Sequence, residues 1–292
     1  MNILVTGSYG QLGSEIRELA PSYSNHQFVF VDSKECDITQ KSEIEKWIEI
    51  NEINGIINCA AYTAVDLAED EASKAKAVNA DAVRNLVEIA EEHELRLIHV
   101  STDYVFDGTA RLPIEVDATI NPIGVYGKTK AEGEKYVLQS LGDAIVIRTS
   151  WVFSSYGKNF VKTILRLINE KPEIGVVADQ FGSPTYAHDL ASACIKIMTQ
   201  SEPIRSKGSI YHYCNEGAIN WYQFAKEIAT LSGKKDYPIN AITTDDFPTK
   251  AKRPVYSVLS TDRIKADFGL TIRNWKEALK ECISKIEAGK LD

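Results

Sequence analysis

The chain has 292 residues, of which 44% are hydrophobic and 25% are charged, and these ordinary values exclude disordered and fibrous proteins. Lys and Arg number 33 against 41 Asp and Glu, so the formal net charge of -8 argues against a nucleic-acid-binding surface. The length suits one cofactor domain with a smaller region attached.

Short apolar runs rich in β-formers alternate with amphipathic helical patterns through the first half of the chain. Such alternation predicts parallel βαβ units, and therefore an α/β fold with a Rossmann-like doubly wound parallel sheet. We predict strands at 2–6, 28–31, 56–60, 97–101 and 144–148, and helices at 11–19, after residue 39, around 83–90 and after residue 126.

The alternation becomes less regular beyond Trp151. There we predict a helix at 160–168, a strand at 175–177, a helix at 187–198 and a strand at 210–214. We expect residues 1–150 to form the dinucleotide-binding Rossmann domain, with later segments at about 175–215 returning to it. Residues 151–292 are expected to be mainly a smaller C-terminal α/β substrate-binding region.

The cysteines and the apolar runs bear on location and partners. The five cysteines are odd in number and scattered, with no Cys-x-x-Cys pair, so the sequence predicts neither a zinc site nor a disulfide framework. No apolar run approaches the length of a membrane span, and MNILVTGSYG reads as a strand and a turn rather than as a signal peptide. We therefore expect a cytoplasmic protein with no membrane partner and no nucleic-acid partner.

Three glycines form G-x-x-G-x-x-G directly after the first predicted strand: Gly7, Gly10 and Gly13. A glycine loop at a helix N-terminus lets backbone N–H groups and the helix dipole meet a pyrophosphate, which a Cβ would keep away. The pattern therefore predicts NADH or NADPH binding. A tight turn that holds no nucleotide is the alternative.

Asp32 ends the second predicted strand about 20 residues after this loop, where a carboxylate can accept the hydroxyls of the adenosine ribose. It would repel a 2′-phosphate, so the pattern favours NADH. Ser33 and Lys34 follow at once and could accommodate that phosphate, and an acidic residue at a strand end is often only a turn residue. NADPH therefore stays open.

Tyr126 and Lys130 lie four residues apart in Y-G-K-T-K, one turn apart on the same side of a helix. A phenol has a pKa near ~10, and a neighbouring cation can lower that pKa toward neutrality and make the phenol a better proton donor. The same spacing recurs at Tyr222 and Lys226 inside the amphipathic run WYQFAKEIA.

Position separates the two copies. Tyr126 follows the strand that ends at Thr102, whose hydroxyl could hydrogen-bond a substrate carbonyl at the carboxyl edge of a doubly wound sheet. No hydroxyl-bearing strand end precedes Tyr222, which we therefore expect to pack on a helix face. Tyr126, Lys130 and Thr102 are the predicted catalytic residues.

Several motifs together resemble the dTDP-4-dehydrorhamnose reductases among the extended short-chain dehydrogenase/reductases. The resemblance runs nearly end to end and includes a Ser101-Thr102-Asp103 strand end of the reductase form. The motifs are GSYGQLG at 7–13, NCAAYTAVD at 58–66, STDYVFDG at 101–108, YGKTK at 126–130, RTSWVF at 148–153 and DQFGSPT at 179–185.

The resemblance implies reduction of the C4 ketone of dTDP-4-dehydro-L-rhamnose by NADH or NADPH, with Tyr126 as the proton donor. It also implies a dTDP-sugar as substrate and a monomer or homodimer. We expect no catalytic metal, because hydride transfer assisted by a phenol does not need one and no His/Cys/carboxylate cluster stands out. Site roles that the resemblance implies are Gln11 and Leu12 at the pyrophosphate, Asp37 and Ile38 at the adenine, Ala60, Ala61 and Tyr62 at the middle of the cofactor, and Thr102, Asp103 and Trp151 at the sugar.

Some of these roles have structural alternatives. Asp103 could be a strand-end turn residue, Trp151 could belong to the core, and Asn79, which matches a superfamily position, could cap a helix. Donors for a nucleotide diphosphate could come from Lys158, Asn159, Lys162 and Arg253.

Two rival functions remain. One is a non-catalytic NADP-binding regulatory subunit similar to the β subunit of methionine adenosyltransferase, which would bind cofactor without turnover. The other is a nucleotide-sugar epimerase or dehydratase of the same superfamily. Intact Tyr126, Lys130 and Thr102 argue against the first, and Asp103-Tyr104, where dehydratases carry Asp-Glu, argues against dehydration.

Overall fold

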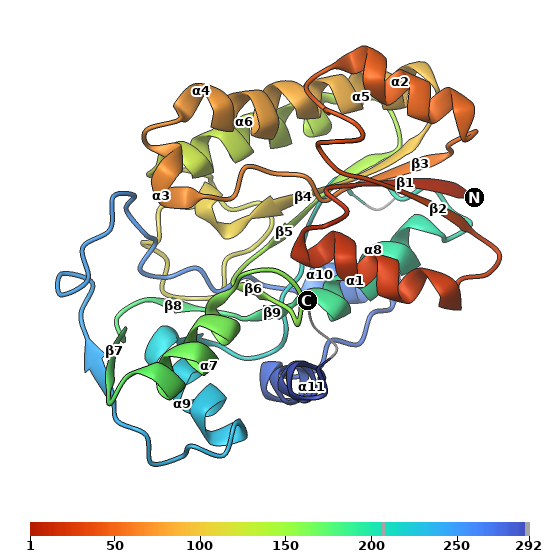
Figure 1. The fold of residues 1–292 in the computed structure, drawn as a ribbon. Coiled ribbons are helices and arrows are strands. Elements are labelled where there is room, and N and C mark those ends of the chain that lie inside the picture. Colours follow the sequence, from red (N-terminus) through yellow and green to blue (C-terminus); the bar gives the residue numbers. More distant parts are fainter. Residues whose placement is uncertain (206–207, 290–292) are drawn as a thin grey trace.

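The computed structural model describes residues 1–205 and 208–289. Within these residues, six strands pair in parallel as one central sheet, in the order β10-β5-β4-β3-β1-β2 (Figure 1). The chain starts in the interior at β1, steps out to β2 and returns to β3 on the other side of β1, which is the doubly wound pattern expected. The strands are β1 (Asn2–Thr6), β2 (Gln27–Val31), β3 (Gly55–Asn58), β4 (Arg96–Thr102), β5 (Ala144–Thr149) and β10 (Ile210–His212).

Helices cover both faces of this sheet (Figure 1). Each strand alternates its side chains between the faces, so two separate apolar layers form. On one face lie α1 (Gln11–Leu19), α8 (Ala187–Met198) and α10 (Asp262–Phe268); on the other lie α2 (Lys41–Ile50), α4 (Ala72–Lys76), α5 (Ala82–Glu92) and α6 (Val125–Gln139), with the short α3 (Val65–Ala68) near the start of α6. The predicted Rossmann-like α/β fold is confirmed.

The predicted strand at 56–60 ends two residues early, at Asn58. Asn58 Oδ1 accepts a hydrogen bond from the backbone N–H of Ala60 at 3.2 Å. An asparagine side chain that bonds the backbone two residues ahead turns the chain out of the strand. The predicted helices at 11–19 and 187–198 have the observed bounds.

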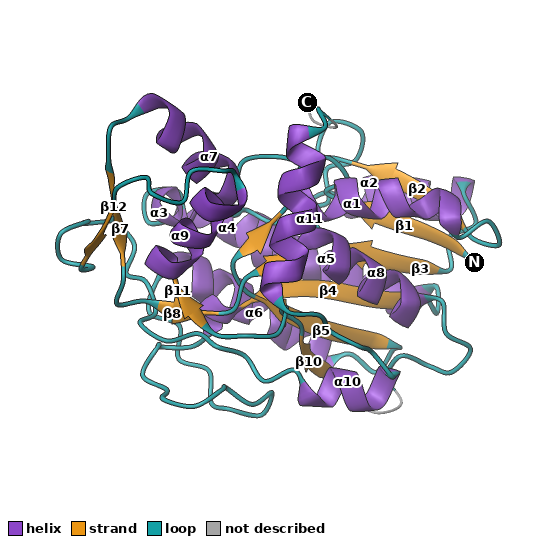
Figure 2. Cartoon of the chain, turned by 90° about the horizontal axis from the view of Figure 1, so that it is seen from below, coloured by secondary structure: helices purple, strands orange, loops and turns teal. Residues whose placement is uncertain are grey.

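The remaining elements have their own apolar core and gather at the end of the main sheet away from the N-terminus (Figure 2). Short strands pair there as β6 (Val152–Phe153) with β9 (Thr185–Tyr186), β7 (Ile174–Val177) with β12 (Ile239–Ile242), and β8 (Phe181–Gly182) with β11 (Ile219–Asn220). Their helices are α7 (Phe160–Glu170), α9 (Trp221–Leu231) and α11 (Trp275–Glu287).

Of the segments expected to return to the first domain, α8 packs on the main sheet and β10 joins it, whereas β7 pairs with β12 outside it. The division at residue 150 stays a prediction. Among the described helices, none is both long enough and apolar enough to span a membrane.

Candidate active site

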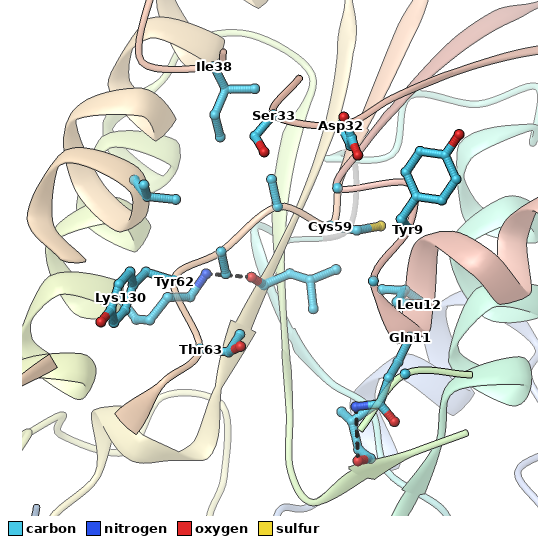
Figure 3. A pocket seen from close by; sticks show the side chains of 18 of the residues that line it. Tyr9, Gln11, Leu12, Asp32, Ser33, Ile38, Cys59, Tyr62, Thr63 and Lys130 are labelled. Carbon is cyan, nitrogen blue, oxygen red and sulfur yellow. Dashed lines mark hydrogen bonds between the residues drawn. The ribbon is translucent and has the colours of Figure 1, made fainter. Parts of the chain in front are cut away.

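A cavity of about 650 Å³ opens where the glycine loop meets the carboxyl ends of β1 to β4 (Figure 3). This volume is within the usual range for a cofactor site. The predicted cofactor residues converge on it from segments far apart in the sequence. Those that line it are Gly7, Gly10, Gln11, Leu12, Asp32, Asp37, Ile38, Ala60, Ala61, Tyr62, Tyr126 and Lys130.

The glycine loop fits a pyrophosphate. Gly7 has φ +64°, and a Cβ on it would lie 2.7 Å from the backbone of Ala60, so the close approach of the loop to the end of β3 requires glycine. In the described structure α1 begins at Gln11, and its N-cap residue Gly10 offers no side-chain cap; the first turn also has no acidic residue. Its first N–H groups are therefore open to an anion.

Gly13 is the predicted loop residue that does not line the cavity. A Cβ there would lie 2.5 Å from the carbonyl oxygen of Gly7, so this glycine lets α1 pack directly beneath the loop. Its role is in the shape of the turn.

At the adenosine end, Asp32 and Ser33 both line the cavity. One oxygen of Asp32 accepts the backbone N–H of Lys34 at 2.8 Å, so the carboxylate is held at the strand end with its other oxygen available for a ribose. Tyr9 also lines the cavity, and the Arg17 guanidinium lies 4.6 Å from the centre of its ring. Sequence motifs did not identify Tyr9.

At the other end, Tyr126 in the first turn of α6 lies beside Thr102 at the end of β4, close enough for Thr102 to lower the pKa of the phenol. Thr102 Oγ1 in turn donates to Asp103 Oδ1 at 3.0 Å. Gly127 makes this proximity possible, because a Cβ there would lie 2.2 Å from the carbonyl oxygen of Tyr104. The fold thus brings together three of the predicted site residues.

The phenol is not acidified by the lysine in this structure. Burial raises the pKa of Tyr126 above its usual value, while the neighbouring Thr102 opposes that rise. The Lys130 amine is occupied elsewhere: its Nζ donates to the Val100 carbonyl at 2.8 Å and lies 3.2 Å from His99 Nε2. Burial lowers the pKa of Lys130 to about 8, which also reduces its effect as a cation.

Asp103 is buried beside the phenol. Burial raises the pKa of its carboxyl to about 6, against hydrogen bonds from Ser257 and Thr102 that favour the charged form. Ser257 comes from the irregular C-terminal segment, and no sequence pattern pointed to it. A protonated or charged carboxyl at this place can hydrogen-bond a sugar hydroxyl.

Trp151 is not among the described residues that line the cavity, although its neighbour Val152 is. Its φ is +48°, and its indole stacks on Trp221 with ring centres 3.5 Å apart. A Cβ on Gly182 would lie 2.5 Å from this indole, so glycine is required on that side. A role for Trp151 at the sugar stays a prediction.

The candidate diphosphate donors separate in space. Lys158 lines the cavity, whereas Asn159 caps α7 and donates to Gln11 Oε1 at 3.0 Å. Lys162 donates to the Ser155 carbonyl, and Arg253 pairs with Asp66 at 2.7 Å.

Asn79 and Tyr222 both make contacts that support the fold. The buried Asn79 accepts the N–H of Tyr62 and donates to Thr129, which ties the β3–α3 loop to α6 rather than capping a helix. Tyr222 packs against the apolar core of the C-terminal region.

Among the described residues, no group of three or more His, Cys, Asp or Glu is arranged to hold a metal ion.

Comparisons with known proteins agree with this geometry. The family model described as the RmlD substrate binding domain matches residues 1–288. A dTDP-4-dehydrorhamnose reductase from Aggregatibacter actinomycetemcomitans is 43% identical over 286 residues, covering 95% of this chain and 97% of the relative.

Two solved structures of proteins with the same name are also similar. The one from Clostridium acetobutylicum ATCC 824 is 38% identical with a TM-score of 0.91, covering 98% of this chain and 100% of that chain. The one from Bacillus anthracis str. Ames, in complex with NADP, is 35% identical with a TM-score of 0.91, covering 97% of this chain and 99% of that chain.

Proposed function

The chain belongs to the RmlD substrate binding domain family, and from this premise we propose that it reduces the C4 ketone of dTDP-4-dehydro-L-rhamnose to dTDP-L-rhamnose with NADH or NADPH. The observation that carries the proposal is the position of Tyr126 at the wall of the glycine-loop cavity, beside Thr102 at the end of β4. The NADP complex of the Bacillus anthracis relative supports a nicotinamide dinucleotide in this cavity.

The dinucleotide, when bound, supplies the hydride for the ketone carbon. Tyr126 then gives its phenolic proton to the alkoxide oxygen that forms at C4. The raised pKa of Tyr126 does not prevent this transfer, because an alkoxide is a far stronger base than a phenolate. Thr102 lies beside the phenol and, by turning its hydroxyl away from Asp103, can hold the carbonyl oxygen near Tyr126.

Other residues bind and orient. Lys130 lies on the cavity wall, where its remaining N–H donor can hold a ribose hydroxyl of the cofactor. Asp103 and Trp151 are proposed to contact the sugar, and Asp32 the adenosine ribose. We also propose that the enzyme works in the cytoplasm, as a monomer or homodimer.

The test mixes the purified protein with dTDP-4-dehydrorhamnose and NADH or NADPH, and follows the loss of nicotinamide absorbance. The expected result is oxidation of one cofactor per sugar, with dTDP-rhamnose identified as the product by NMR. Running both cofactors in parallel also measures the preference to which Asp32 contributes.

Two outcomes contradict the proposal. Cofactor binding without oxidation of either nicotinamide would favour the regulatory-subunit alternative. Conversion of a dTDP-sugar without net cofactor consumption would favour an epimerase or a dehydratase.

A further inference from the structure

A line of buried polar side chains crosses the sheet beneath the cavity and ends at Lys130. Thr6 and Asn58 are register partners on β1 and β3, and Asn58 and His99 are partners on β3 and β4. Thr6 Oγ1 lies 2.7 Å from Asn58 Oδ1, Asn58 Nδ2 lies 2.9 Å from His99 Nδ1, and His99 Nε2 lies 3.2 Å from Lys130 Nζ. The four side chains are 0–1% exposed.

The orientation of the Asn58 amide is fixed by the backbone. The N–H of Ala60 lies 3.2 Å from Asn58 Oδ1, and a backbone N–H can only donate. The atom facing Ala60 is therefore the amide oxygen, and the atom facing His99 is the amide nitrogen. The Thr6 hydroxyl donates to the same oxygen.

This orientation sets the tautomer of His99. The pKa of His99 is well below its usual value, because burial disfavours the imidazolium, so the ring carries one proton. Asn58 Nδ2 can only donate, so Nδ1 must be the acceptor. The ring proton then lies on Nε2, pointing at Lys130.

A proton on Nε2 has a consequence for Lys130. An ammonium group offers donors only, whereas a neutral amine has a lone pair that can accept the Nε2–H while it donates to the Val100 carbonyl. Burial acts in the same direction. Two groups favour the charged form of Lys130 and raise its pKa: Glu134 on α6 and Cys59 after β3. Glu134 is itself held by Arg148 of β5.

We propose that His99, held in its Nε2–H form by Asn58, is a positioning residue that donates a hydrogen bond to the neutral Lys130 amine and so favours loss of the Lys130 proton. Lys130 is then a titrating group of the site rather than a permanent cation. This inference rests on the proposed function where it concerns the rate, since a charged Lys130 holds the ribose of the bound cofactor more strongly than a neutral one.

The first test is independent of any substrate. Asn58→Asp places a carboxylate of nearly the same shape beside His99, and a carboxylate can only accept, so the ring proton should move to Nδ1. We would record ¹⁵N NMR spectra of protein labelled at histidine and assign the His99 signals from their loss in His99→Gln. The expected spectra show Nε2 protonated in the wild type and Nδ1 protonated in Asn58→Asp. A wild-type proton on Nδ1 would overturn the inference.

The second test is the pH profile of ketone reduction. The rate should fall as pH rises through the pKa of Lys130. In Asn58→Asp the His99 Nε2 lone pair, and in His99→Gln the side-chain oxygen, can accept a hydrogen bond from the Lys130 ammonium. This raises the pKa of Lys130, so the alkaline limb of the profile should move up by about one pH unit. His93→Gln, the same change at an exposed histidine, is the matched control and should leave the limb in place.

The outcomes separate the two proposals. Variants with lower rates but an unmoved alkaline limb would indicate a merely structural role for His99 and contradict the inference. If one variant does not fold, the other gives the same comparison. An enzyme that turns over no dTDP-sugar contradicts the proposed function, while the NMR result still decides the tautomer.

Discussion

Arg148 and Glu134 form a buried bidentate ion pair that joins β5 to α6. The guanidinium Nε and Nη2 donate to the two carboxylate oxygens at 2.9 and 2.8 Å, and the side chains are 2% and 1% exposed. Because α6 also carries Tyr126 and Lys130, this pair fixes the helix on which the proposed chemistry depends. A charge left alone at this depth would be costly.

Glu134→Leu should therefore lower the free energy of unfolding by about 3–5 kcal/mol, because it leaves the Arg148 charge buried without its partner. Urea unfolding followed by circular dichroism measures this loss. The double variant Glu134→Leu with Arg148→Met should recover part of it. A double variant as unstable as the sum of the two single variants would contradict the ion-pair explanation.

Tyr126→Phe should lower the rate of ketone reduction by about 10²–10⁴-fold, because the proton donor is lost while the ring remains. Its dissociation constant for NADH or NADPH, measured by fluorescence titration, should stay close to the wild-type value. Tyr222→Phe is the matched control from the second Tyr-x-x-x-Lys and should keep full activity. Similar losses in both variants would refute the choice of Tyr126.

Gly7→Ala should weaken cofactor binding at least about tenfold, because its Cβ would meet the backbone of Ala60 at a positive φ. Gly233→Ala is the matched control: its φ is +78°, but no described atom lies within 4 Å of the added Cβ. Fluorescence titration with NADPH should show weaker binding only for Gly7→Ala. Equal affinities for the two variants would argue against the close approach at the loop.

Gly182→Ala should move the Trp151 indole away from Trp221, because the added methyl would lie 2.5 Å from the ring. Near-ultraviolet circular dichroism should lose the signal of the stacked indoles. If Trp151 contacts the sugar, KM for the dTDP-sugar should rise several-fold with unchanged cofactor affinity. A lost stack with normal KM would show that Trp151 is only a packing residue.

Asp103→Asn should make the folded protein more stable at neutral pH. The pKa of Asp103 is raised from 3.8 to about 6, so its contribution to stability is fully present below pH 4 and is lost as pH rises through 6. The variant lacks this loss and should exceed the wild type by about 2–3 kcal/mol at pH 7. Urea unfolding from pH 4 to pH 7 measures the difference, and a difference independent of pH would contradict a raised pKa.

Local patterns in the sequence were sufficient for the α/β fold and for most of the predicted residues that line the glycine-loop cavity. The glycine loop, the strand before it and the helix after it are contiguous in the chain, and glycine at Gly7 and Gly13 has a direct steric reason. Parallel strands end at the same edge, so Asp32, Ala60 and Thr102 all lie at that edge of the sheet. They lie at or just after the ends of β2, β3 and β4.

Only the tertiary structure decided how the charged groups of the site are balanced. Sequence spacing placed Lys130 one turn from Tyr126 and predicted an acidified phenol, but burial raises the pKa of that phenol and the Lys130 amine turns to His99 and Val100. Hydrogen-bond partners and burial depend on which strands lie side by side, and no local pattern carries that information. The fold therefore follows from periodicity along the chain, whereas the proton chemistry follows from contacts across it.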